Sequence, residues 1–220
     1  MTEVTSNFIT AYPTKRINID KLQSFLPYSW ISSVDQTNLE QGTVTCITLD
    51  EDSPEYKKLA EQVVPFHDRE GRIYRIRQID QVENSYVYLM YLTKRHEHYR
   101  EFISQEHCCF HGTNSNNAPN IVANNLNWRF FGRAVGFVHG QGVYFSKKPL
   151  VSAAYAVMHK QNACMLVAKV LVASMAAGNS NTKLPPQFYD TTGTGDDILV
   201  KYSDNEFYPE YIVYFSRSAK

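Results

Sequence analysis

Neither sign of charge dominates this sequence of 220 residues, because 22 lysines and arginines balance 22 aspartates and glutamates. A chain without a net positive field cannot hold a polyanion through counterion release alone, so we expect no direct binding of nucleic acid. Long apolar runs are also missing, and none approaches the roughly 18 apolar residues that a membrane-spanning helix requires. The sequence therefore predicts that the partner of this protein is not a membrane.

Cysteine is scarce as well: the chain has four, and two of them, Cys108 and Cys109, are adjacent. Adjacent cysteines have neither the geometry of a disulfide nor the spacing of a zinc knuckle. The N-terminal residues show no secretion signal. We therefore predict reduced thiols in an intracellular protein, cytoplasmic or nuclear.

The histidines lack the spacing of a metal site. His96 and His98 point in different directions on a helix, and neither they nor His107 have a cysteine or acidic ligand at a useful spacing. We interpret these histidines and the whole segment 94–98 as solvated surface, and we predict no metal.

Phosphate-binding motifs are missing too. Gly132, Gly136, Gly140 and Gly142 lie close together, but the pattern G-x-x-x-x-G-K-[ST] does not occur. We expect these glycines to belong to a loop between strands.

What the chain does have is a large apolar and aromatic content. Apolar residues make up 43% of it and aromatic residues 13%, including 15 tyrosines. This composition is typical of a globular protein, and the length suits one domain. Residues 1–18 show little periodicity and are predicted to be an arm, with the folded part beginning near Ile19.

Helix signals come early and strand signals late. Ser53-Pro54-Glu55 combines an N-cap, a first-turn proline and an early acid, which predicts a helix from Pro54 onward. A strand at 72–82 and a second helix at 84–102 are expected next. The later expected elements are helices at 117–124 and from Pro149, and strands at 108–110, 142–146, 163–173, 198–202 and 208–215. Early helices followed by mostly antiparallel strands indicate an α+β fold.

Three short motifs occur in a recognisable order: Phe110-His111-Gly112-Thr113, Gly142-Val143-Tyr144-Phe145-Ser146 and Ser152-Ala153-Ala154-Tyr155. Together they resemble the catalytic domain of the PARP-type ADP-ribosyltransferases, in particular its mono-ADP-ribosylating branch. The resemblance covers about residues 44–217, and the 33 positions between His111 and Tyr144 suit that family. It implies one catalytic domain over residues 1–220, with a split, mostly antiparallel β-sheet core and peripheral helices.

The resemblance also implies that NAD+ is the co-substrate and suggests how its nicotinamide is held. The backbone of Gly112 would pair with the carboxamide, where glycine permits close approach. Ser152 would donate its hydroxyl proton to the carboxamide oxygen. Tyr144 and Tyr155 would stack on the two faces of the ring.

The remainder of NAD+ is expected to contact other residues of the same motifs. The resemblance implies a hydrogen bond between His111 and the ribose on the adenosine side, with Thr113 close enough to assist. The segment 130–140 corresponds to the family's donor-site loop, in which Arg133 or His139 would reach the pyrophosphate.

The third position of the catalytic triad departs from the chain-building relatives, which carry a glutamate there. The matching residue in this chain is Ile198, so the expected triad is His111, Tyr144 and Ile198. Glu210 stands in a similar-looking segment, but few residues follow it, so we expect it on the last strand and Ile198 at the head of the strand before.

The resulting hypothesis is transfer of one ADP-ribose unit from NAD+ to a protein acceptor, either another protein or the protein itself, with release of nicotinamide. Two alternatives stay open at this point. One is a catalytically inactive scaffold of the same fold, although the intact His111 favours activity. The other is a polymer-forming enzyme that uses Glu210 in place of the missing acid.

Overall fold

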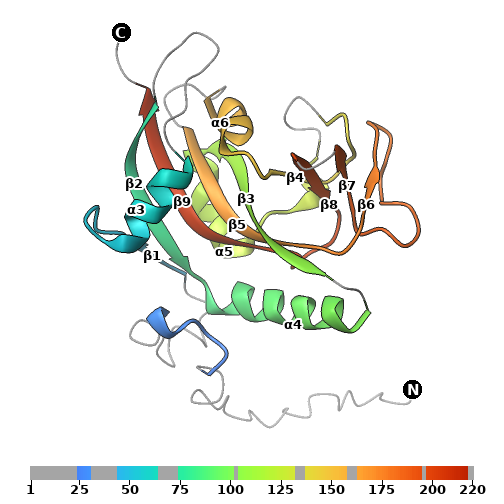
Figure 1. Cartoon of the computed structure of the whole chain (residues 1–220), viewed down its shortest axis with the longest axis horizontal. Helices are drawn as coiled ribbons and strands as arrows, with labels where there is room; N and C mark the ends of the chain where they lie inside the picture. Colours follow the sequence, from blue (N-terminus) through green and yellow to red (C-terminus); the bar gives the residue numbers. More distant parts are fainter. Residues whose placement is uncertain are drawn as a thin grey trace, which may run out of the picture.

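One sheet, to which the described residues contribute nine strands, organises the fold (Figure 1). A computed structural model describes residues 24–30, 44–63, 74–101, 104–131, 137–157, 163–194 and 197–217. The strands are β1 (Thr45–Thr48), β2 (Tyr74–Glu83), β3 (Gln105–Asn114), β4 (Val143–Ser146), β5 (Ala163–Val172), β6 (Met175–Ala177), β7 (Thr191–Thr194), β8 (Ile198–Lys201) and β9 (Phe207–Arg217). Their order across the sheet is β1-β2-β9-β5-β3-β4-β8-β7-β6. The predicted arm at 1–18 lies outside the described residues.

The helices surround this sheet, and α3 begins at a side-chain N-cap. They are α3 (Pro54–Val63), α4 (Ser85–Glu101), α5 (Ala118–Asn124) and α6 (Pro149–Val157), with short 3-10 turns η1 (Tyr28–Trp30), η2 (Ser115–Asn117) and η3 (Trp128–Phe130). As predicted, Ser53 caps α3, and its Oγ accepts the amide hydrogen of Tyr56 at 3.1 Å. No helix in the described part of the chain is long and apolar enough to cross a bilayer.

Alternation along the strands gives the sheet two apolar faces. On β3, Cys109 packs in the cluster that α5 covers, whereas the next residue, Phe110, packs in the cluster that α3 and α6 cover. Leu166 and Val167 divide in the same way on β5. A third cluster joins α4 to Trp30 and Tyr208. Because both faces of the central strands are covered, these strands form the rigid part of the molecule.

The sheet is nearly split between β3 and β4. The ladder between β3 and β5 runs from the pair Gln105↔Val172 to the pair Asn114↔Ala163, whereas β3 and β4 share the single pair Phe110↔Ser146. Antiparallel pairing holds the sheet together apart from the parallel pair β6 and β7. The predicted α+β class with a mostly antiparallel, split sheet is therefore confirmed.

Several strands differ from the prediction. β3 is longer than the predicted 108–110, and β1, β6 and β7 were not expected. β1 is a four-residue edge strand with mostly exposed side chains, and β6 has three residues, so neither shows the alternation that marks a strand in the sequence. β7 contains Gly193, a residue that weakens strand propensity.

Candidate active site

The side chain of His111 bridges the two parts of the sheet where their backbone pairing ends. Its Nδ1 lies 2.8 Å from the carbonyl oxygen of Tyr144 on β4, one position after the single backbone pair at Phe110. The imidazole also packs against Phe145, with ring centroids 5.9 Å apart. The structure therefore brings the predicted His111 and Tyr144 into direct contact.

Burial determines whether the imidazole is charged, and the contact with Tyr144 determines which of its nitrogens carries the proton. Burial lowers the pKa of His111, although the hydrogen bond to Tyr144 acts in the opposite direction, so the ring is neutral at neutral pH. A carbonyl oxygen only accepts hydrogen bonds, which places the proton on Nδ1. The other nitrogen, Nε2, then carries a lone pair that can accept a hydrogen bond from a hydroxyl group.

Gly112 lies where β3 meets the backbone of α6. A Cβ atom on this residue would stand 1.8 Å from the carbonyl oxygen of Ser152 and 2.9 Å from the amide nitrogen of Ala156. The requirement for glycine thus comes from helix packing, whereas the sequence suggested a close approach by the ligand. Pairing of the Gly112 backbone with a carboxamide stays a prediction.

Two predicted hydroxyl contacts already have partners within the protein. Ser152 is buried on α6, and its Oγ donates to the carbonyl oxygen of Phe110 at 2.8 Å. Thr113 is buried on β3, and its Oγ1 accepts a hydrogen bond from Asn117 at 3.3 Å. A bound carboxamide would have to replace Phe110 as the acceptor of the Ser152 proton.

The two tyrosines predicted to stack on a ring lie close to one another. Tyr144 is half-buried on β4, and Tyr155 lies on α6 with 38% of its surface exposed. Burial is the main cause that raises the pKa of the Tyr144 phenol, and the nearby phenol of Tyr155 adds to it. The ring of Tyr144 therefore stays uncharged at neutral pH, and both rings can offer flat, apolar faces.

Sheet order separates the two candidates for the third triad position. Ile198 begins β8 and pairs with Ser146 on β4, the strand that carries Tyr144. Glu210 lies on β9, and β5, β3 and β4 stand between β9 and β8. At the usual spacing this is on the order of 19 Å across the sheet. Glu210 instead forms an ion pair with Lys169, 3.1 Å away. The two predicted strand assignments, Ile198 at the head of β8 and Glu210 on β9, are confirmed.

The predicted donor-site loop at 130–140 is only partly described. Arg133 lies outside the described residues, whereas the backbone of His139 is held on both sides. Its N–H donates to Tyr144 Oη at 2.9 Å, and its carbonyl oxygen accepts from Thr192 Oγ1 at 2.6 Å. The sequence did not indicate a role for Thr192.

Two cavities lie away from the split between β3 and β4. One, of about 470 Å³, is lined by residues that include Glu55, Lys58, Cys108 and Glu210 between α3 and the sheet. Burial, with Glu210 nearby, raises the pKa of Cys108, which makes this thiol a poor nucleophile at neutral pH. The other cavity, of about 260 Å³, is lined largely by asparagines near Arg129. Neither includes a residue predicted to hold NAD+.

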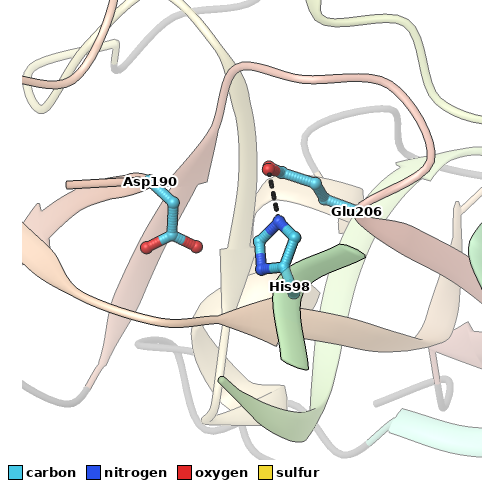
Figure 2. Close-up of side chains that lie close together, drawn as sticks. All are labelled: His98, Asp190 and Glu206. Carbon is cyan, nitrogen blue, oxygen red and sulfur yellow. Dashed lines mark hydrogen bonds and ion pairs between the residues drawn. The ribbon is translucent and has the colours of Figure 1, made fainter. Parts of the chain in front are cut away.

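His98 contradicts the prediction that segment 94–98 is solvated surface. It is 3% exposed, and its Nε2 lies 3.1 Å from Glu206 Oε1. Figure 2 marks this interaction with a dashed line. Asp190 is near both, and ligand atoms of the three residues lie within 4.8 Å of one another. The prediction was wrong for His98 because α4 turns this residue toward the β7 and β9 ends, which its position in the sequence does not reveal.

Lys201 supplies the positive charge of this cluster. Its Nζ lies 2.7 Å from Asp190 Oδ2 and 3.0 Å from Glu206 Oε2, and its side chain is fully buried. Burial alone would raise the pKa of Asp190, but the ammonium group lowers it overall. A metal ion would have to displace this ammonium, so we interpret the cluster as an internal ion-pair network. A lysine within the apolar run Ile198–Tyr202 was the signal in the sequence.

Most of this chain is similar to known proteins. A family model of the poly(ADP-ribose) polymerase catalytic domain matches residues 53–206. The protein mono-ADP-ribosyltransferase PARP12 of Homo sapiens is 28% identical over 190 residues, 79% of this chain and 26% of the relative, and that of Mus musculus is 27% identical with the same coverage. Protein mono-ADP-ribosyltransferase PARP11 of Mus musculus is 25% identical over 204 residues, 77% of this chain and 60% of the relative. The chain thus spans only part of the length of these relatives.

Replacing Lys201 by methionine is expected to lower the free energy of unfolding by about 3 to 5 kcal/mol, because two buried carboxylates lose their cation. The matched control is Lys148→Met, whose ion pair with Asp197 is also 2.7 Å long but exposed. That change should cost about 1 kcal/mol or less. Urea unfolding of both variants measures the difference, and similar small losses would contradict the network.

The lowered pKa of His111 predicts a pH-dependent stability. As the pH falls below about 6.5, the unfolded chain binds a proton at this residue before the folded chain does, so the folded state loses stability. In His111→Gln, which can still donate to the Tyr144 carbonyl, the loss between pH 7.5 and pH 5 should be smaller, by at most about 2 kcal/mol. Urea unfolding at both pH values checks this, and equal losses in the two proteins would refute it.

Proposed function

The chain belongs to the poly(ADP-ribose) polymerase catalytic-domain family, and on this premise we propose that it transfers one ADP-ribose unit from NAD+ to a protein acceptor. The observation that carries the proposal is the contact between His111 and Tyr144 across the split sheet, with Ile198 opening the strand beside Tyr144. A single-unit product agrees with the names of the relatives, which are mono-ADP-ribosyltransferases.

In this proposal the nicotinamide of NAD+ binds beside β3 and α6. The ladder between β3 and β4 does not extend to Gly112, so its backbone has no register partner on β4 and would pair with the carboxamide instead. Ser152 would exchange its bond to Phe110 for one to the carboxamide oxygen. Tyr144 and Tyr155 would stack on the ring, a contact worth on the order of 1 kcal/mol beyond burial.

The neutral imidazole of His111 has the properties needed to orient a ribose. Its Nδ1–H donates a hydrogen bond to the Tyr144 carbonyl, so Nε2 can accept a hydrogen bond from a ribose hydroxyl. Thr113 follows on the same strand and would assist. Because the imidazole is held by β4 as well as β3, a sugar bound to it would be fixed relative to both parts of the sheet.

The proposed reaction breaks the bond between the ribose carbon and the nicotinamide nitrogen and forms a bond from that carbon to the acceptor. The transition state has oxocarbenium character, as in glycoside hydrolysis. The departing nicotinamide takes the bonding electrons and leaves uncharged, and the acceptor loses a proton. With Ile198 at the third position, no carboxylate there can polarise the acceptor, so transfer depends on positioning and on the acceptor's own nucleophilicity.

Ile198 at the third triad position also argues against polymer formation. Extension of a chain requires a group that holds and polarises a ribose hydroxyl of the previous unit, and an aliphatic side chain provides none. Glu210 is a poor substitute, because three strands separate its strand from β8 and it is paired with Lys169. The acceptor is proposed to be a protein, either another protein or this protein itself, within the cytoplasm or nucleus.

Incubation with NAD+ and candidate acceptor proteins should release nicotinamide and add single ADP-ribose masses. His111→Ala should reduce transfer by about a hundredfold or more, a barrier increase of at least about 2.7 kcal/mol, because the ribose loses its orienting group. His107→Ala, the same change four positions earlier on β3, is the control and should stay within about twofold of the parent. Intact-mass spectrometry and nicotinamide release measure the outcome. A silent parent protein would favour the scaffold alternative.

Glu210→Gln should leave transfer within about tenfold of the parent, a barrier change no larger than about 1.4 kcal/mol, with products still carrying single units. The reason is its distance across the sheet from the His111 and Tyr144 pair. The same mass measurement reports both rate and product. A loss of several hundredfold, or ladders of ADP-ribose polymer from the parent, would restore the polymer-forming alternative.

A further inference from the structure

Two buried hydroxyl groups hold the end of the donor-site loop. Thr192 Oγ1 donates to the carbonyl oxygen of His139 at 2.6 Å. Tyr202 Oη is hydrogen-bonded to Thr192 Oγ1 and lies 3.4 Å from the same carbonyl. Since Thr192 gives its proton to His139, the tyrosine is the donor in the pair. Thr192 is 0% exposed and Tyr202 is 5% exposed, so water does not compete for these bonds.

The same two loop residues hold the hydroxyl of Tyr144. Tyr144 Oη accepts the amide hydrogen of His139 at 2.9 Å and donates to the carbonyl oxygen of Gly140 at 2.8 Å. The segment His139–Gly140 therefore lies between Tyr144 on one side and the Thr192 and Tyr202 hydroxyls on the other. A shift of this segment would move the ring of Tyr144.

The packing around His139–Gly140 leaves no room for a Cβ atom on Gly140 itself or on the nearby Gly178. Gly140 has φ +138, and a Cβ on it would lie 1.6 Å from Tyr202 Oη. A Cβ on Gly178 would lie 2.0 Å from the carbonyl oxygen of His139. The loop end is thus packed directly against the hydroxyl groups that hold it.

Backbone pairing already holds the strands beside the two hydroxyls, which are β7, the strand of Thr192, and β8, the strand that Tyr202 follows. β4 pairs with β8 from Val143↔Lys201 to Ser146↔Ile198, and β7 pairs with β8 through its backbone as well. These three strands lie next to one another at one end of the sheet (Figure 1). Removing a hydroxyl should therefore leave the sheet intact and release only the loop end.

We propose that Thr192 and Tyr202 are positioning residues, which hold His139–Gly140 and through it the ring of Tyr144 in the place where the NAD+ donor binds. This inference rests on the proposed function, because the ligand is the NAD+ of that reaction. Neither residue touches the reacting atoms. Their effect should therefore fall on binding of the donor and not on the chemical step.

The test compares variants that lose a hydroxyl with variants that keep one. Tyr202→Phe and Thr192→Val each remove the hydroxyl with little change of shape, and Thr192→Ser retains it. Tyr208→Phe is the matched control, since Tyr208 is a buried tyrosine whose Oη donates to the carbonyl oxygen of Val82 at 2.7 Å, away from the loop. For each protein the Kd and KM for NAD+, kcat and Tm are measured, together with hydrogen exchange of the peptide 137–142.

Tyr202→Phe and Thr192→Val should raise the Kd and KM for NAD+ about tenfold, the change expected from loss of one neutral hydrogen bond, while kcat stays within about twofold. Their 137–142 peptide should exchange faster than in the parent. Thr192→Ser should behave like the parent, and Tyr208→Phe should lower Tm without changing the Kd for NAD+.

Three results would overturn the inference. One is a lower Tm with an unchanged Kd in Tyr202→Phe and Thr192→Val, which would make the hydroxyls merely structural. The second is a Thr192→Ser protein as impaired as Thr192→Val. The third is a parent that does not bind NAD+, which would remove the proposed function as well. A parent that binds NAD+ but transfers nothing would refute the proposed function alone, because the Kd comparison still decides the role of the hydroxyls.

Discussion

The hydrogen bond between the His111 imidazole and the Tyr144 carbonyl is the interaction on which the arrangement of the site depends. β3 and β4 share one backbone pair, so the two parts of the sheet have little other connection at this point. Beyond the pair Phe110↔Ser146, this side-chain hydrogen bond takes the place of a further backbone pair between β3 and β4. It also uses the Nδ1 proton, which determines that the free ring nitrogen is an acceptor.

The two parts of the sheet share one apolar cluster and differ in their other interactions. On the β5 side, long ladders and two apolar clusters hold β3 in place. On the β8 side the strands have four residues each, and buried polar groups add to the backbone pairing. Lys201 joins Asp190 to Glu206, and the hydroxyl of Thr192 holds the carbonyl of His139. Fully partnered polar groups in a buried environment hold a specific geometry that apolar contacts alone define less well.

These ladders, apolar clusters and buried polar groups bear on the proposed chemistry, because they hold the site residues in place. Most of the protein's contribution would be positioning: the ribose at His111, the nicotinamide between two tyrosines, and the donor-site loop at His139. The absence of a carboxylate at Ile198 is consistent with transfer of a single unit, because such a site can hold the donor without activating a second sugar. The same short strand ends in Lys201, so β8 contributes to the fold at one end and borders the site at the other.

Local signals in the sequence were sufficient for the elements and for the motifs. Ser53-Pro54 predicted where α3 begins, and the order of the motifs that contain His111, Tyr144 and Tyr155 indicated the family before any contact was known, since caps and short motifs act over a few residues. What the tertiary structure alone decided are the relations between distant residues. The burial of His98 against Glu206, the clash that a Cβ on Gly112 would make with α6, and the hold of Thr192 and Tyr202 on the donor-site loop all join segments far apart in the chain. A single sequence carries little sign of such pairs, because each partner looks ordinary in its own local context. Their meaning arises only when the sheet brings the partners together.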